Sequence, residues 1–251
     1  MEKKLLLGVV VVVCLCGSAA LALDPMGPPA AGHNQSQWSI GAEYSYSDMD
    51  LLRTRDRANI RDVIMNKVYL KAGYGISNNW EVFGRVGFAD FEYQRATWGS
   101  GANWWSGEDN GSYALGMGTK ATFRENADTK WGGLAQLSWV NFDGKHANPE
   151  ASYSPGKFEI DIYEVQIAVG PTHRLGEGIF IYGGPFLHLV DGELMHINSD
   201  GDRDNYPIEE RSMVGAYIGT QVDITENSVI NVEYQLTGDA TAISFGFIWM
   251  L

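Results

Sequence analysis

From residue 38 onward, apolar and polar side chains alternate along the chain. In residues 38–47 the apolar positions hold Trp, Ile, Ala and Tyr, and the positions between them hold Ser, Gly and Glu. A period of two is the pattern of a β-strand with one apolar face. It predicts ten strands and no helix, at about 38–47, 67–76, 80–88, 112–124, 131–142, 157–173, 179–191, 214–224, 230–236 and 243–251.

Two of these segments depart from simple alternation. In residues 157–173 the apolar positions are even-numbered as far as Ile162 and odd-numbered from Val165 onward, so we expect a β-bulge near Tyr163. Residues 179–191 are apolar on both faces, and glycines interrupt them, so the sequence does not assign their facing. Because this stretch is ambiguous, eight strands is the alternative to ten.

The connections between the segments alternate in length. Short ones fall at 77–79, 125–129, 175–178 and 225–228, and long ones at about 48–62, 94–111, 143–156 and 192–210. Residues 238–241 are the exception, a short connection on the long side. Short turns at one end and long loops at the other are typical of outer-membrane barrels, whose short turns face the periplasm. The alternative is a soluble sandwich or lipocalin-like fold.

The polar face of the segments favours the membrane alternative. It carries mainly Gly, Ser, Gln and Tyr with a few charges of both signs, which suits a narrow lumen better than a water-covered surface. Lipid cannot satisfy the edge of a sheet, so the strands must close. We therefore expect an all-β, closed antiparallel transmembrane β-barrel. The expected lumen-lining charges are Glu43, Lys67, Lys71, Glu81, Arg85, Lys120, Arg124, Asp223 and Glu233. They form either a paired, plugging network or a narrow ion path.

The first 22 residues are typical of an export signal. Lys3 and Lys4 precede an apolar run, and Ala20-Leu21-Ala22 is a small-residue cleavage pattern. We expect a signal peptide at 1–22, a flexible periplasmic leader at 23–37, rich in Pro and Gly, and a barrel at 38–251. Cys14 and Cys16 lie upstream of the cleavage site, so a disulfide framework is excluded from the mature chain.

The net charge of the chain bears on the class of partner. The formal net charge is −13, with no cluster of Lys and Arg. Binding to nucleic-acid phosphates depends on clustered basic side chains, so nucleic acid is excluded as a partner. Lipid of the bacterial outer membrane is the expected surrounding.

The C-terminal segment carries the most specific motif. Ser244, Gly246, Trp249 and Leu251 fill the places of a polar residue, a glycine and two hydrophobic residues, and this segment resembles the barrel-assembly signal of outer-membrane proteins. Leu251 departs from the Phe that is commonest at the last place. The turn within 74–82 also resembles the periplasmic turns of small barrels. The chain is similar to the broad OmpA/OmpX/OmpW-like class, and this resemblance implies the barrel-assembly machinery as a partner.

Two long connections hold candidate binding residues. Trp98, Trp104 and Trp105 lie among Gly and Ser, where they would stack on surface glycans, rest at lipid headgroups or pack on one another. Asp200, Asp202 and Asp204 have the alternate spacing of a calcium loop. Arg211 stands where such a loop needs its closing glutamate, so a solvated acidic loop is the alternative, and no other cofactor is expected.

The sequence does not contain a nucleophile motif, and we expect no enzymatic activity. His188, Asp191 and Asp90 are the residues that an outer-membrane hydrolase would use as a base and its orienting groups. The favoured function is a structural barrel or a narrow pore for ions and small solutes. The alternative is a surface adhesion module that binds through its extracellular loops.

Overall fold

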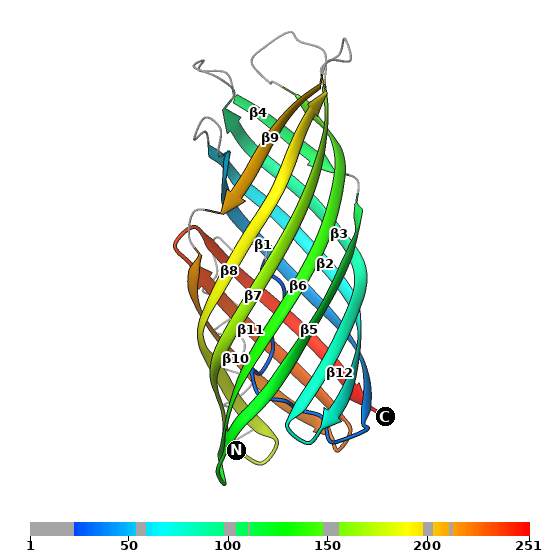
Figure 1. Cartoon of the computed structure of the whole chain (residues 1–251), viewed down its shortest axis with the longest axis vertical. Helices are drawn as coiled ribbons and strands as arrows, with labels where there is room; N and C mark the ends of the chain where they lie inside the picture. The colour runs from blue at the N-terminus through cyan, green and yellow to red at the C-terminus, as the bar shows by residue number, and fades with distance from the viewer. Residues whose placement is uncertain are drawn as a thin grey trace.

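The computed structural model describes residues 23–53, 59–97, 104–109, 111–147, 156–197, 203–210 and 213–251. The expected signal peptide, Trp98, Asp200 and Asp202 lie outside these ranges. The described residues form twelve antiparallel strands in one closed wall (Figure 1). Their bounds are β1 Trp38–Arg53, β2 Asn59–Ser77, β3 Trp80–Thr97, β4 Trp104–Asp109, β5 Ser112–Glu125, β6 Thr129–Ala147, β7 Gly156–Gly176, β8 Ile179–Ile197, β9 Arg203–Glu210, β10 Val214–Thr225, β11 Ser228–Thr237 and β12 Ala240–Met250.

The half of the barrel that holds the C-terminus is a ring of ten strands. Its order is β1, β2, β3, β5, β6, β7, β8, β10, β11 and β12. The ring closes where β12 pairs with β1, from Ser39 opposite Met250 to Met49 opposite Ala240. The short turns gather at this end (Figure 1). The expected closed barrel of ten strands is confirmed.

The other half of the barrel has only eight strands. There the short strand β4 takes the place of β5 between β3 and β6, and β9 bridges β8 to β1 in place of β10, β11 and β12. The hairpin of β11 and β12 therefore ends partway along the wall (Figure 1). This explains the short connection at 238–241, because its turn lies beneath β9. Eight strands leave an interior that side chains just fill.

An apolar core fills the eight-stranded section. Aromatic and aliphatic side chains from all around its wall meet there, and Phe91 contacts Phe142 and Phe158 with ring centroids 4.9 Å and 6.0 Å apart. Met49, Leu51, Ile160, Ile162 and Leu194 complete much of this cluster. The inward face of the strands is therefore apolar in one half of the barrel, whereas in the other half it carries the buried charged side chains together with a smaller apolar cluster.

This change of lining overturns the bulge predicted near Tyr163. Even-numbered residues of β7 point inward from Phe158 to Ala168, and the register with β6 and β8 continues without a shift at Tyr163. Ile160 and Ile162 belong to the apolar core, whereas Ile167 faces outward. The sequence pattern changes side because the strand passes from an apolar interior to an apolar exterior. The same even-inward facing holds for β8, which the sequence left unassigned.

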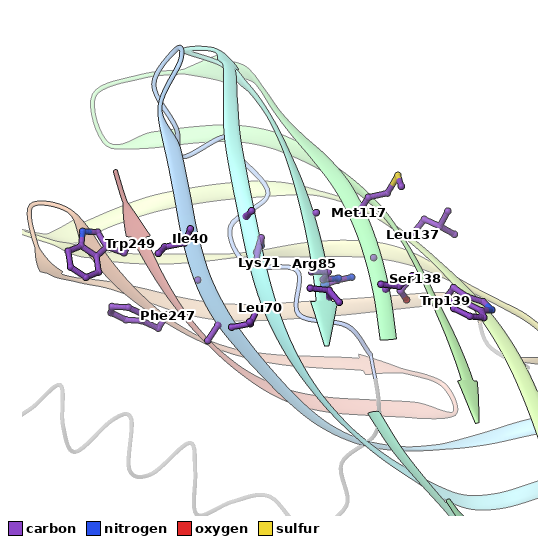
Figure 2. Close-up of a pocket in the computed structure, with 17 residues that line it drawn as sticks. Ile40, Leu70, Lys71, Arg85, Met117, Leu137, Ser138, Trp139, Phe247 and Trp249 are labelled. Atoms are coloured by element: carbon purple, nitrogen blue, oxygen red, sulfur yellow. The ribbon is translucent and has the colours of Figure 1, made fainter. Parts of the chain in front are cut away.

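The outward face marks where lipid covers the wall. Large apolar side chains are exposed on the ten-stranded section, and Figure 2 shows some of them around an apolar depression of about 940 Å³ spanning β12, β1, β2, β3, β5 and β6. On the eight-stranded section the outward residues include like-charged cross-strand pairs, Asp143 with Glu159 and Asp161 with Glu193. Such pairs are unfavourable unless water screens them, so this section projects beyond the lipid.

Candidate functional site in the plugged lumen

Residues 23–33 lie inside the ten-stranded section and plug its lumen. The segment enters at the C-terminal end of the barrel and runs inward to Leu23, which is fully buried (Figure 1). Leu23 and Met26 pack with Phe83, Leu134 and Phe186 of the wall. A flexible leader was expected here, and the structure differs. Three prolines reduce the number of backbone N–H groups that need partners in this narrow space, which favours an extended plug.

The deep end of the plug is held by charge. The Asp24 carboxylate accepts hydrogen bonds from Lys67 Nζ at 3.1 Å and Arg85 Nη2 at 2.7 Å. Tyr69 donates its hydroxyl proton to the same carboxylate at 3.1 Å. Asp24 therefore ties the plug to β2 and β3 through two buried ion pairs.

A second set of contacts fixes the backbone of the plug. Glu233 of β11 accepts hydrogen bonds from the backbone N–H groups of Met26 at 3.0 Å and Gly27 at 2.8 Å. The Gln235 side chain donates to the Asp24 carbonyl oxygen at 2.8 Å. These bonds join the beginning of the described chain to one of its last strands.

A third set lies near the rim that holds the short turns. His33 Nδ1 is 2.6 Å from Glu81 Oε2, and His33 Nε2 is 2.6 Å from Ser39 Oγ. The same Glu81 oxygen accepts the backbone N–H groups of Gly32 at 2.7 Å and His33 at 3.1 Å. All three side chains are buried. The rim thus holds a serine, a histidine and a carboxylate in one hydrogen-bonded row.

Most of the charges expected in the lumen lie there. The buried ones are Glu43, Lys67, Lys71, Glu81, Arg85, Lys120 and Glu233. They interact with one another as well as with the plug, since Lys71 Nζ contacts Glu43 Oε1 at 2.7 Å and Arg85 Nη1 lies 3.7 Å from Glu43 Oε2. Arg124 and Asp223 were expected in the lumen but are exposed near the short turns. Each sits where its strand ends, so water reaches a side chain that would be enclosed farther inward.

Sequence reasoning missed several residues of the site. Asp24 and His33 lie in a segment without strand periodicity, and Glu164 lies just where the apolar pattern of β7 changes side. Glu164 is buried and pairs with Lys67. The signal that was available was one acid and one histidine placed among the apolar residues and prolines of the segment from 23 to 33.

The residues that a hydrolase would use as a base and its orienting groups lie apart in the structure. His188 is buried inside the barrel, whereas Asp90 and Asp191 are exposed on the outer face. A side chain that faces the interior cannot converge with side chains that face outward from the same wall. The three residues therefore do not form a base with its orienting groups.

The candidate loop residues are only partly within the described ranges. Trp104 and Trp105 belong to β4, opposite Thr97 and Ala96 of β3. Asp204 lies in β9 opposite His196. Within the ranges that the structure describes, no group of three or more histidine, cysteine or acidic side chains converges as a metal site. The calcium hypothesis for Asp200, Asp202 and Asp204 stays a prediction.

The C-terminal motif forms most of the strand that closes the barrel. Ser244 faces the lumen and is buried, whereas Trp249 and Leu251 are exposed on the outside. Gly246 pairs with Glu43 of β1 and with Asn231 of β11. Recognition of this strand by assembly machinery stays a prediction from the motif.

No protein family and no curated protein matches the sequence. Among solved structures, the translocator domain of the autotransporter NalP from Neisseria meningitidis is similar with a TM-score of 0.50 and 9% identity, over 87% of this chain and 89% of that chain. The outer membrane protease OmpT from Escherichia coli is similar with a TM-score of 0.49 and 8% identity, over 88% of this chain and 96% of that chain. The outer membrane protein OprG from Pseudomonas aeruginosa is similar with a TM-score of 0.42 and 12% identity, over 88% of this chain and 98% of that chain.

The closed antiparallel ring, the apolar outer band and the likeness to the NalP domain together define the class. The protein has the fold of outer-membrane β-barrels. No helix in the described ranges has the length and apolar character needed to span a membrane.

Proposed function

We propose that this protein is a non-conducting structural barrel, which anchors an extracellular section and its loops in the outer membrane. The observation that carries the proposal is that the interior is filled at two successive levels. The plug occupies the polar lumen of the ten-stranded section, and the apolar core occupies the eight-stranded section. An ion would have to displace the plug and then cross the apolar core.

The two closures have different physical origins. Removing one partner from a buried ion pair costs about 3–5 kcal/mol, so the Asp24 contacts oppose withdrawal of the plug. A dry core of Phe, Ile and Leu offers no ligand to an ion even when the plug is absent, and stripping water from a charge is far more costly. The apolar core therefore closes the barrel whether or not the plug is in place.

Export and assembly complete the proposal. Cleavage after Ala22 would release the chain at Leu23, the first residue of the described plug, which is fully buried. The Ser244 to Leu251 segment would serve as the signal for the assembly machinery, which places the barrel in outer-membrane lipid. Catalysis has no part in this anchoring role.

Conductance across a planar lipid bilayer tests the proposal. We expect no steady openings for the wild-type protein, and none for a variant that lacks residues 23–33, because the apolar core remains. A variant that also carries F91A, F142A and F158A should conduct, since it removes three contacting rings of the core. Steady openings of the wild type would support the narrow-pore alternative and overturn the proposal.

A second candidate function is adhesion through the projecting section. The observation that favours it is the charged outer face of the eight-stranded wall, which lifts the loop ends away from the lipid. Its test is binding of the purified protein to surface glycans, with the variant W98A/W104A/W105A compared against wild type. Equal binding would refute a role for these tryptophans.

Calorimetric titration of the protein with calcium, to millimolar concentration, tests the calcium hypothesis for Asp200, Asp202 and Asp204. Absence of binding over this range would refute that hypothesis.

A further inference from the structure

The row formed by Ser39, His33 and Glu81 has the arrangement of an activated nucleophile. We propose that Ser39 is a catalytic serine, with His33 as its general base and Glu81 as the residue that orients His33, and that the site hydrolyses carboxylic esters reaching it from the periplasm. This activity is separate from the anchoring role of the barrel. The two distances of 2.6 Å are within the range for a nucleophile, its base and the group behind the base.

In the neutral form of His33, the hydrogen bonds fit the protonation pattern that such a site needs. A carboxylate accepts hydrogen bonds, so the proton between Glu81 and His33 belongs to Nδ1 of the imidazole. The lone pair of Nε2 then faces Ser39, whose hydroxyl donates to it. This is the tautomer in which the histidine is able to remove the serine proton.

Glu81 is itself held in one orientation. Its Oε2 atom accepts the backbone N–H groups of Gly32 and His33 as well as the ring N–H. The residue that carries the imidazole is thus fixed to the same oxygen through its main chain. A base held at two points loses little freedom on binding its substrate, which is the condition for efficient proton transfer.

Gly73 allows the backbone of β2 to pack closely beside the reacting atoms. It lies on β2 opposite Ser39 of β1, and a Cβ atom at this position would be 2.6 Å from Ser39 Oγ and 3.0 Å from His33 Nε2. A side chain there would clash with both atoms, so glycine is what allows the β2 backbone to lie this close to the nucleophile and the base. Lys71, two residues along β2 on the same inward face, brings a positive charge to this side of the sheet.

The reaction balances with water as the only co-reactant. Ser39 Oγ bonds to the acyl carbon of the ester while its proton moves to His33 Nε2. The carbon–oxygen bond to the alcohol breaks, and the alcohol leaves with the proton from Nε2. Water then attacks the acyl-serine, giving its proton to Nε2, and the serine oxygen regains that proton as the carboxylic acid departs.

The position of the row determines the side from which a substrate would come. Ser39 is the second residue of β1, and its neighbour Trp38 is exposed at the end of the wall that holds the short turns. Gly32, Asn34 and Gln35 flank the histidine and are exposed at the same end. A small ester dissolved in the periplasm would approach between these residues, whereas the plug and the core block access from the outside.

Labelling with an alkyl fluorophosphonate, which reacts with activated serines, tests the proposal in the full-length purified protein. We expect a covalent adduct on the peptide that contains Ser39 in the wild type and none in S39A. The matched control is S45A, which changes another buried, inward-facing serine of β1 and should leave the label on Ser39. Heat-unfolded wild type should give no adduct, which shows that the fold activates the serine.

Hydrolysis of p-nitrophenyl butyrate supplies the second measurement. Loss of a general base lowers the rate by about 10²–10⁴-fold, so H33Q should fall by that factor while S45A stays at the wild-type rate. E81Q tests the positioning residue, because it should displace the pH–rate profile as well as lower the rate. Circular dichroism confirms that each variant is folded.

The outcomes separate this proposal from a purely mechanical role. If the three residues only fasten the plug, folded wild type will show neither an adduct on Ser39 nor ester hydrolysis above S39A, and the proposal is overturned. If S39A keeps the wild-type rate, another group is responsible and Ser39 is not the nucleophile. Bilayer conductance is independent of both results, so failure here does not bear on the proposed anchoring function.

Discussion

Replacing Asp24 by asparagine should release the plug without unfolding the barrel. The change leaves Lys67 and Arg85 buried without the carboxylate that lies 3.1 Å and 2.7 Å from them. Breaking a buried ion pair costs about 3–5 kcal/mol. Lys67 retains Glu164, and Arg85 retains Glu43 at 3.7 Å, so we expect about 3 kcal/mol. The open population should therefore rise about 10²-fold.

Cysteine accessibility measures this release directly. Ala30 is buried within the plug, and a cysteine placed there would be the sole thiol of a chain cleaved after Ala22. The rate of maleimide labelling of A30C follows the fraction of unseated plug, and D24N should raise it about 10²-fold at equal barrel content by circular dichroism. E226Q, in an exposed turn, is the matched control. Equal labelling rates in D24N and E226Q would refute the reasoning.

Three further expectations concern space inside the barrel. G73A places a Cβ 2.6 Å from Ser39 Oγ, so thermal unfolding should show about 1–3 kcal/mol of destabilisation, and an unchanged melting temperature contradicts the close contact. F142A removes a fully buried ring and should lower the free energy of unfolding by about 3–5 kcal/mol. F123A, which removes an exposed ring, should lower it by less than about 0.5 kcal/mol. Four residues inserted after Ala22 should prevent Leu23 from reaching its buried position, so A30C should be labelled faster than without the insertion. An unchanged rate of labelling would contradict this expectation.

The sequence was a good guide where one physical rule applied along the whole strand. In the ten-stranded section lipid lies on one side and a polar lumen on the other, so apolar residues such as Ile40 and Leu70 always point outward. The rule changes in the eight-stranded section, where Ile160 and Ile162 point inward and acidic residues point outward. Periodicity reports that two faces differ but does not report which face is inside, and the expected bulge arose from that ambiguity.

The site was less accessible to sequence reasoning than the fold. Alternation placed Glu43, Lys67 and Arg85 on the polar face, because an inward position can be read from a strand. The main partner of Lys67 and Arg85 is Asp24, which lies in a segment that is not a strand, and no local pattern relates it to residues more than forty positions away. The row of His33, Ser39 and Glu81 likewise depends on how the plug enters the barrel, which is a property of the tertiary structure.

The plug also has a consequence for the order in which the molecule folds. Its hydrogen bonds join Asp24 to Gln235 across 211 positions of sequence, and Met26 to Glu233 across 207. Contacts of such long separation form slowly, because the intervening chain must be ordered before they bring any gain. These partners share one chamber only after β12 has met β1 and the wall is continuous. The residues at the beginning of the described chain are therefore the last to reach their final places.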